Sequence, residues 1–437
     1  MAVADRWMRD LATHPHARAL PTLPTLDGPH GRRALYLRAL AVAAGAPGAD
    51  AGQLLGLTRA ALGTDRGRAI KPWQRILLFT FETIACSALN APLPPENLDA
   101  FREEQSEDGS YFAMPLVTGM VHIALRRQAP ADSVARRCCD ALLSQQQPDG
   151  TWRFLISEVW DTGLMARSLR GVPDFETSAR SHAQEFLAAA QSEDGGWGCT
   201  TRLSSDNDST GNTLLALAGT PWATRVRTSA GRYTHRRRTP EGLWTTWQSR
   251  DDGPAPDVVA HMAAGARVVR VPGLDLTHAE RWLAALQTEG CWPSDWYLPP
   301  TYSAAEITPV LSDHPRSRHA SAQAVIAAQR DDGGWPRIRG EDHSSPTATG
   351  LALTALCACP GAAPPGVIEA AVRYLIDTQD GDGTWTDRPL MYGPRPFLTV
   401  TAPQVHALTS RGLRDALTCD TTTQNSPPSP RPPAAHP

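Results

Sequence analysis

The chain has 437 residues, a formal net charge of −3 and 20% charged residues, and this balance predicts no nucleic-acid partner. It has no run of 18 apolar residues, so we expect no membrane-spanning helix, although peripheral contact with a membrane stays open. The eight cysteines lack the spacing of a metal site, and the first ten residues are already charged. Both features predict a cytoplasmic protein without a signal peptide and without a protein-bound metal.

The chain divides into four predicted parts. Residues 1–30 are interrupted by Pro15, Pro21, Pro24 and Pro29 and predict an extended lead-in. Residues 31–155 predict a small helical lobe, and residues 156–419 a larger helical domain. Residues 420–437 are Pro-rich and polar, so we expect a disordered tail. The basic stretch 225–238 is interpreted as the solvated face of an outer helix rather than as an anion site.

A short motif recurs through most of the chain. It has Gln or, once, Arg, then an acidic residue, Gly and an aromatic residue, and its copies start 41 to 50 residues apart. Such a period indicates one repeated supersecondary unit. The seven copies are Gln105–Tyr111, Gln146–Trp152, Gln191–Trp197, Arg238–Trp244, Gln287–Trp292, Gln329–Trp335 and Gln379–Trp385.

Each copy closes a stretch with helical periodicity, and a more apolar segment follows most copies. Before the last copy, Val367, Ala371 and Leu375 form one apolar stripe of a helix. The apolar segments include 212–219 and 349–357. Amphipathic helices that alternate with apolar ones predict an all-α fold in which an outer ring of helices surrounds an inner ring, an α/α barrel. We interpret the repeat aromatics, such as Trp197, Trp335 and Trp385, as staples between helices rather than as substrate contacts.

Acid chemistry is indicated by the segment Asp206-Asn207-Asp208-Ser209-Thr210, which follows the third repeat and opens an apolar helix. Asp and Ser before a helix are ordinary N-caps, so the segment alone is a weak indicator. Within the repeat array, its two carboxyl groups are predicted to lie at the mouth of the barrel.

With these motifs together, the chain resembles the squalene-hopene cyclase and class II terpene cyclase family, which carries QW-type repeats. The family's D-x-D-D-T motif is matched by Asp206, Asp208 and Thr210, with Ser209 replacing the last carboxylate. Further matches are the V-W-D-T-G-L segment at 159–164, D-V-x-A-H at 257–261, W-x3-W-x5-Y at Trp292, Trp296 and Tyr302, and a serine-rich turn at 344–346. The resemblance covers roughly residues 158–413. It implies a catalytic β-type barrel and a reduced γ-type lobe.

The resemblance implies a role for each residue of the acid site. Asp208 matches the proton donor, His261 matches the protonated histidine that holds and polarises that acid, and Asp206 matches its structural partner. Protonation of an alkene requires a desolvated, protonated carboxyl group whose anion is stabilised as the proton leaves. Ser209 is the departure from the family. A neutral Cys at that place in the oxidosqualene branch leaves two possibilities open, an oxygenated substrate or a slightly weaker acid that acts on an ordinary alkene.

The substrate-binding residues implied by the resemblance are largely aromatic. Trp160, Trp296 and Tyr302 match aromatics that line the cavity, where cation–π attraction stabilises a migrating carbocation. Asp161 lies in the same V-W-D-T-G-L segment. Phe397 lies where related chains carry further aromatics, although its local pattern departs from theirs.

The reduced lobe favours an isoprenoid substrate shorter than thirty carbons. The segment Gly109–Pro115 is loosely similar to one in bacterial cyclases that take farnesyl or geranylgeranyl diphosphate. Because no D-D-x-x-D motif occurs, a diphosphate would survive into the product, with Mg²⁺ as its counterion. Squalene, an epoxide or a prenylated meroterpenoid precursor stay open as substrates.

Two other classes of protein remain open. One is a zinc protein prenyltransferase-like subunit, for which D-x-D supplies no thiolate, and the other is a noncatalytic terpenoid-binding protein.

Overall fold

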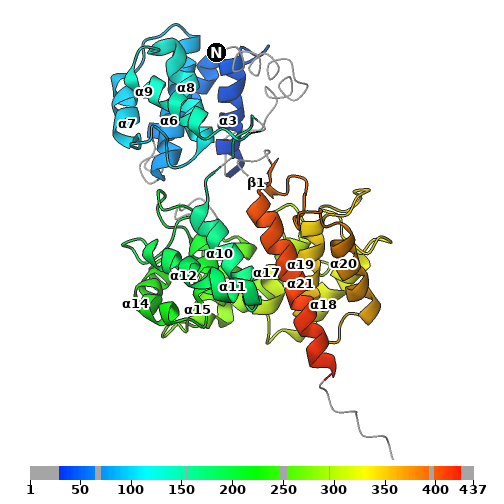
Figure 1. The fold of residues 1–437 in the computed structure, drawn as a ribbon. Coiled ribbons are helices and arrows are strands. Elements are labelled where there is room, and N and C mark those ends of the chain that lie inside the picture. Colours follow the sequence, from blue (N-terminus) through cyan, green and yellow to red (C-terminus); the bar gives the residue numbers. More distant parts are fainter. Residues whose placement is uncertain are drawn as a thin grey trace, which may run out of the picture.

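The computed structural model describes residues 29–63, 70–148, 150–153, 155–246, 253–294, 296–392 and 398–424. These residues form two helical lobes, one stacked on the other, and the chain passes once from the first lobe to the second (Figure 1). The predicted lead-in lies almost wholly outside the described residues. Of the predicted tail, α21 includes residues 420–424, and the rest lies outside them.

The small lobe packs its helices around α6, which contacts α3, α4, α7 and α8. Helix α6 carries buried Ile76, Phe81 and Ile84. The lobe consists of α3 (Pro29–Ala44), α4 (Ala51–Gly63), α6 (Pro72–Ala88), α7 (Pro95–Glu104), α8 (Pro115–Gln128) and α9 (Ser133–Ser144).

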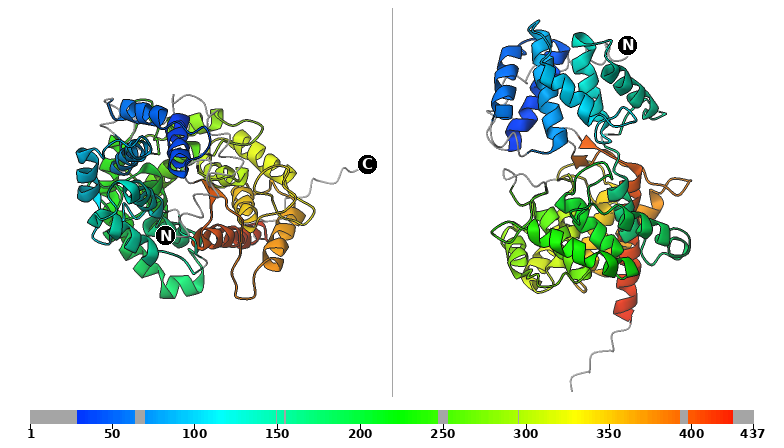
Figure 2. Two further views of the ribbon diagram at one scale, coloured as in Figure 1. Left: turned by 90° about the horizontal axis from the view of Figure 1, so that it is seen from above. Right: turned by 90° about the vertical axis from the view of Figure 1, so that its left-hand side faces the viewer.

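Six helices of the large lobe form a closed inner ring among the described residues. Each contacts the next, and the last contacts the first, so the ring has no open edge (Figure 2). Most of their residues are buried on all sides; every residue of α19 from Pro346 to Leu356 is buried. In chain order the ring is α10 (Glu158–Ser168), α13 (Asn207–Leu217), α15 (Pro256–Val268), α17 (Pro300–Ile307), α19 (Pro346–Cys357) and α21 (Ala402–Gln424).

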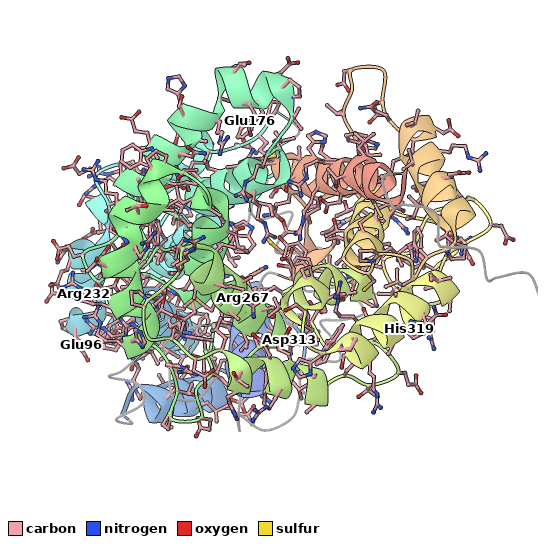
Figure 3. All side chains as sticks on the ribbon, turned by 90° about the horizontal axis from the view of Figure 1, so that it is seen from below. Glu96, Glu176, Arg232, Arg267, Asp313 and His319 are labelled. Carbon is pink, nitrogen blue, oxygen red and sulfur yellow. The ribbon has the colours of Figure 1, made fainter. Side chains whose placement is uncertain are left out.

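A second set of helices surrounds this ring and places its polar side chains outward. Glu176, Arg232 and His319 lie on the outer side of the barrel, and Arg232 belongs to the basic stretch predicted to be an outer face (Figure 3). The all-α barrel with an inner and an outer ring is thus confirmed. The outer helices are α11 (Pro173–Ser178), α12 (Arg180–Ala189), α14 (Pro221–Arg236), α16 (Thr277–Ala285), α18 (Pro315–Ala327) and α20 (Pro365–Asp377).

The repeat motif is a hydrogen-bonded staple that ends the helix before it. In the third copy, the Gln191 side chain donates to Gly195 O at 2.9 Å, and Trp197 Nε1 donates to Leu187 O at 2.6 Å. Gly195 has a φ of +89°, which a residue with a Cβ adopts only with strain. All seven copies make both contacts, with the Tyr111 hydroxyl replacing the indole in the first. The interpretation of Trp197, Trp335 and Trp385 as staples is confirmed.

Two short strands and one 3-10 turn complete the described structure. Strands β1 (Met391–Tyr392) and β2 (Leu398–Thr399) pair antiparallel, and Met391 also bridges to Tyr297. The 3-10 turn η2 (Thr308–Val310) continues α17. In the described part of the chain, no helix is both long and apolar enough to cross a bilayer.

Candidate active site

The N-terminus of α13 is built by a tight hairpin that runs back from the third repeat. The Asp206 N–H donates to Trp197 O at 3.0 Å, and the Trp197 N–H donates to Thr210 Oγ1 at 2.9 Å. Asp206 is the N-cap: its carboxylate accepts from the Ser209 N–H at 2.7 Å and from Ser209 Oγ at 2.9 Å. Asp206 and Ser209 therefore bond to each other, and Asp208 in the first helical turn is left to face another partner.

That partner is His261. The Asp208 Oδ1 lies 2.6 Å from His261 Nδ1, and the histidine, in the middle of α15, is completely buried. Asp208 has 8% of its surface exposed, and nothing among the described residues hydrogen-bonds to its second oxygen, Oδ2. One carboxyl oxygen is thus held by the imidazole, while the other has no hydrogen-bond partner among the described residues. The prediction that Asp208 and His261 lie together is matched by the geometry.

A buried charge cluster that the sequence did not indicate lies behind the histidine. His261 Nε2 is 3.0 Å from Glu306 Oε2 on α17. The Glu306 carboxylate also accepts two hydrogen bonds from Arg167 on α10, at 2.6 and 3.1 Å, and one from Arg411 on α21 at 2.6 Å. The Nε2 contact is an ion pair rather than an aligned hydrogen bond. Since both ring nitrogens of His261 lie close to carboxyl groups, their charges favour the doubly protonated imidazolium.

The pKa shifts of this cluster follow from burial and charge. Burial lowers the pKa of His261, but the charges of Glu306 and Asp208 outweigh it and raise that pKa to about 9. Burial acts to raise the pKa of Glu306, yet Arg167, Arg411 and His261 hold it well below its usual range. Burial, together with the nearby Asp208 carboxylate, raises the pKa of Asp206 to about 7 despite its bonds from Ser209. His261 and Glu306 are consequently both charged at neutral pH.

Two of the predicted aromatics flank the histidine. The Trp160 ring centroid lies 5.9 Å from that of His261, and the Tyr302 ring meets His261 edge-on at 6.3 Å. Tyr302 in turn stacks on Tyr297 at 3.9 Å. One ring from α10 and one from α17 therefore lie beside His261.

The other residues predicted to bind substrate are Asp161, Trp296 and Phe397. Asp161 accepts hydrogen bonds from Gln404 at 3.2 Å and from Ser157 Oγ at 3.1 Å, and burial raises its pKa. Half-buried Trp296 donates from Nε1 to Thr246 Oγ1 at 3.2 Å. Phe397 lies outside the described residues.

Glu306 could have been suspected from one pattern. It lies four residues after Tyr302 in the apolar helix PTYSAAEI, so both side chains share one face of α17. No comparable pattern marks Arg167 or Arg411, because they come from helices far apart in the chain. In the described part of the chain, no group of three His, Cys, Asp or Glu side chains is placed to hold a metal ion.

Comparison with known proteins finds relatives for about two thirds of the chain. Residues 115–266 match the model of the squalene-hopene cyclase C-terminal domain. Drimenyl diphosphate synthase from Streptomyces showdoensis is 28% identical over 302 residues, which are 65% of this chain and 49% of that protein. The namesake from Streptantibioticus cattleyicolor is 27% identical over 67% of this chain and 58% of that protein. The chain spans about half the length of these curated relatives. The chain is therefore similar to the squalene-hopene cyclase-like family over these parts of its length.

Two solved structures share the helical fold. ent-Copalyl diphosphate synthase from Streptomyces platensis has a TM-score of 0.55 and 16% identity over 94% of both chains. The R337A variant of the type II terpene cyclase MstE from Scytonema, in complex with geranylgeranyl dihydroxybenzoate, has a TM-score of 0.51 and 18% identity over 60% of this chain and 88% of that one. These identities support the helical fold, and the first of them extends over both lobes.

Proposed function

We propose that the protein is a class II terpene cyclase that uses Asp208 as the acid to protonate a linear isoprenoid and start its cyclisation. The single observation that carries the proposal is the 2.6 Å contact between Asp208 Oδ1 and the buried His261, with Oδ2 left unbonded among the described residues. The matches to the squalene-hopene cyclase domain and to two drimenyl diphosphate synthases support it.

The first chemical step is a proton transfer. The O–H bond at Asp208 Oδ2 breaks, the π electrons of the terminal alkene form a new C–H bond, and a tertiary carbocation and the Asp208 carboxylate result. Further alkenes of the same chain then attack the cation and close rings. The last cation loses a proton and the Asp208 carboxylate takes one up, so the acid is restored, the reaction is an isomerisation and no redox partner is needed.

The charges around Asp208 favour its anion as the proton leaves. His261 carries a positive charge on the side of Oδ1, and Arg167 and Arg411 place two more behind it, against the negative charges of Glu306 and of Asp415, which lies 3.8 Å from Arg411. The N-terminus of α13 adds its partial positive charge, because Asp208 lies in the first turn. These groups are held in place before the reaction, so they stabilise the product anion without reorganising.

The rings of Trp160 and Tyr302 suit the cation that the step creates. Both lie beside His261, and both are almost fully buried. Aromatic faces attract a cation by about 0.5 to 2 kcal/mol each, more in a dry site. Neither ring competes for the cation as water would.

We propose a prenyl diphosphate of the farnesyl or geranylgeranyl class as substrate, with the diphosphate retained. The similarity to drimenyl diphosphate synthases supports a diphosphate head group, and Mg²⁺ would act as its counterion rather than as a resident ion. A prenylated aromatic is the second candidate, because MstE was solved with geranylgeranyl dihydroxybenzoate.

The proposal is tested by incubating the purified protein with several isoprenoids, each with and without Mg²⁺. The panel contains geranyl, farnesyl and geranylgeranyl diphosphates, squalene, epoxysqualene and a geranylgeranylated hydroxybenzoate. We expect an isomeric cyclic product, by mass spectrometry, from a prenyl diphosphate. A product from squalene or the aromatic alone would move the substrate to that class. Stoichiometric bound zinc would favour a prenyltransferase-like subunit, and binding of a panel member without turnover a noncatalytic protein.

A further inference from the structure

The single lysine of the chain connects the small lobe to the acid site. Lys71 is the N-cap residue of α6, and its Nζ donates to Ser204 Oγ and to Ser205 O in the large lobe, both at 2.9 Å. The side chain is buried, with 8% of the residue exposed. Ser205 precedes Asp206, the residue that caps the helix carrying Asp208, so the ammonium group lies one residue from that cap.

The segment that Lys71 contacts is fixed on its other side by the third repeat. Ser205 Oγ donates to Asp194 Oδ1 at 2.7 Å, and Asp194 also accepts from Arg237 at 3.1 Å. The backbone packs closely here, because a Cβ at Gly198 would lie 2.5 Å from Leu203 O. The small lobe makes a second contact nearby, where Arg202 donates to Asp108 Oδ2 at 2.5 Å and to Ser110 Oγ at 3.2 Å.

The positive charge of Lys71 also acts on the cap electrostatically. Burial lowers the pKa of Lys71, and the Asp206 charge opposes that shift. In return, the lysine charge opposes the rise in the pKa of Asp206. A carboxylate at Asp206 accepts from both the N–H and the Oγ of Ser209, which holds the first turn of α13.

We infer that Lys71 is a positioning residue through which the small lobe fixes the start of α13 and thereby the orientation of Asp208 toward its substrate. This inference rests on the proposed function of Asp208 as the acid. It makes the two lobes one catalytic unit. Lys71 acts through Ser204, Ser205 and Asp206 and does not itself touch the reacting atoms.

The test compares Lys71→Met, which keeps the aliphatic stem and removes the ammonium group, with Arg59→Met. Arg59 pairs with Glu82 inside the small lobe at 2.7 Å, so its variant removes one cation from the same lobe away from the acid site. We expect Lys71→Met to lower kcat about tenfold or more and to change KM less than about threefold, because a charged buried hydrogen-bond donor is lost. Arg59→Met should keep kcat within about twofold.

Hydrogen exchange gives a measurement that does not depend on turnover. Amides at 204–210 should exchange faster in Lys71→Met than in the wild type and in Arg59→Met. Unchanged exchange with kcat within twofold of wild type would overturn the inference. If the wild type converts no substrate of the panel, the proposed function fails, while the exchange comparison still decides whether Lys71 holds the segment.

Chemical rescue covers the case in which Lys71→Met does not fold. Lys71→Ala should regain activity several-fold with n-propylammonium, which can donate the missing hydrogen bonds. Tetramethylammonium carries the same charge without an N–H and should not restore activity. Equal effects of both ions, or none from either, would contradict a positioning role.

Discussion

The third and sixth repeats lead into two inner helices, α13 and α19, through hairpins with matching hydrogen bonds. The Trp197 N–H donates to Thr210 Oγ1 at 2.9 Å, and the Trp335 N–H donates to Thr349 Oγ1 at 3.0 Å. In each hairpin the N-cap residue donates its own N–H back to the tryptophan carbonyl. We call each hairpin, together with the helix start that follows it, a frame. The shared hydrogen bonds align Asp206 with Ser345 across the two frames, so Asp208 corresponds to Thr347.

The difference between the frames lies in charge. At α19 the cap is the neutral Ser345, whose Oγ donates to Asp387 at 2.5 Å, and Asp387 also accepts from the Thr347 N–H. At α13 both the cap and the residue two positions later carry carboxyl groups, and both are buried. A helix start of this kind therefore folds without a carboxyl group at position 208. Because this kind of helix start needs no carboxyl group at that position, Asp208 and its buried partner His261 fit the chemical role that we propose for them.

The largest effect is expected from Asp208→Asn, which makes the two frames alike in charge at this position. An amide cannot donate a strong proton, so turnover should fall about 100-fold or more while the circular dichroism stays native. Thr347→Val is the matched control in α19 and should keep activity within about twofold. Retention of more than about a tenth of wild-type turnover by Asp208→Asn, a barrier change below about 1.4 kcal/mol, would contradict its assignment as the acid.

A second effect tests whether His261 and Asp208 act as one unit. His261→Ala should lower kcat on the order of 100-fold and change KM far less, because the imidazolium acts mainly in the transition state. The double variant with Asp208→Asn should lose little more than Asp208→Asn alone. His406→Ala, at a histidine on α21 next to Trp385, is the control. Fully additive losses in the cycle would make His261 an ordinary buried histidine.

Glu306→Gln should impair both stability and rate. It leaves Arg167 and Arg411 buried without their carboxylate, which costs about 3 to 5 kcal/mol of unfolding free energy. It should also lower the pKa of His261 and reduce kcat about tenfold.

Glu341→Gln is the matched control near α19, because the Glu341 carboxylate also pairs with two arginines, Arg337 and Arg388. These pairs are less buried, so we expect a loss of about 1 kcal/mol and unchanged kcat. Urea unfolding and steady-state kinetics measure both effects, and equal losses in the two variants would contradict a special role for Glu306.

Stability should depend on pH through His261. Its pKa is about 9 in the folded protein, against about 6.5 in an unfolded chain. A raised pKa contributes stability that is complete below pH about 6.5 and is lost as the pH rises through 9, on the order of 3 kcal/mol in all. Asp206, with a pKa raised to about 7, acts in the same direction but at lower pH. The measurement is urea unfolding at pH 6.5, 8 and 9.5 for the wild type and His261→Asn. Parallel curves for the two proteins would contradict a charged His261.

The sequence predicted the barrel because the repeat combines local signals that need no tertiary information. A glycine at positive φ, a Gln that reaches it and an aromatic that bonds back ten residues earlier all lie within one hairpin. Asp208 and His261 were located by their match to family motifs. Glu306, Arg167 and Arg411 were missed because their cluster exists only when α10, α17 and α21 close the ring, and the pairs are separated by more than 100 residues in the chain.

The smallest effect is expected at Ser209, where the two frames differ only slightly. Its counterpart in α19 is Ala348, whose N–H donates to the Ser345 Oγ at 3.0 Å without a side-chain hydrogen bond beside it. Ser209→Ala should therefore lose one hydrogen bond, about 1 kcal/mol of stability, and keep activity within about threefold.

Ser209→Asp restores the family's full motif but places a second carboxyl group against Asp206. Because the pKa of Asp206 is already raised to about 7, one of the two groups can take up a proton, so we expect a cost of about 1 to 2 kcal/mol. On an alkene substrate this variant should be tolerated or improved, whereas an epoxide substrate should bring no gain. Thermal unfolding and turnover on both substrates measure the outcome. The contrary outcome is an inactive Ser209→Asp with native circular dichroism beside an active Ser209→Ala. It would mean that a carboxyl group at position 209 disturbs Asp208 directly. The role of Ser209 would then be to keep the acid site free of a competing charge.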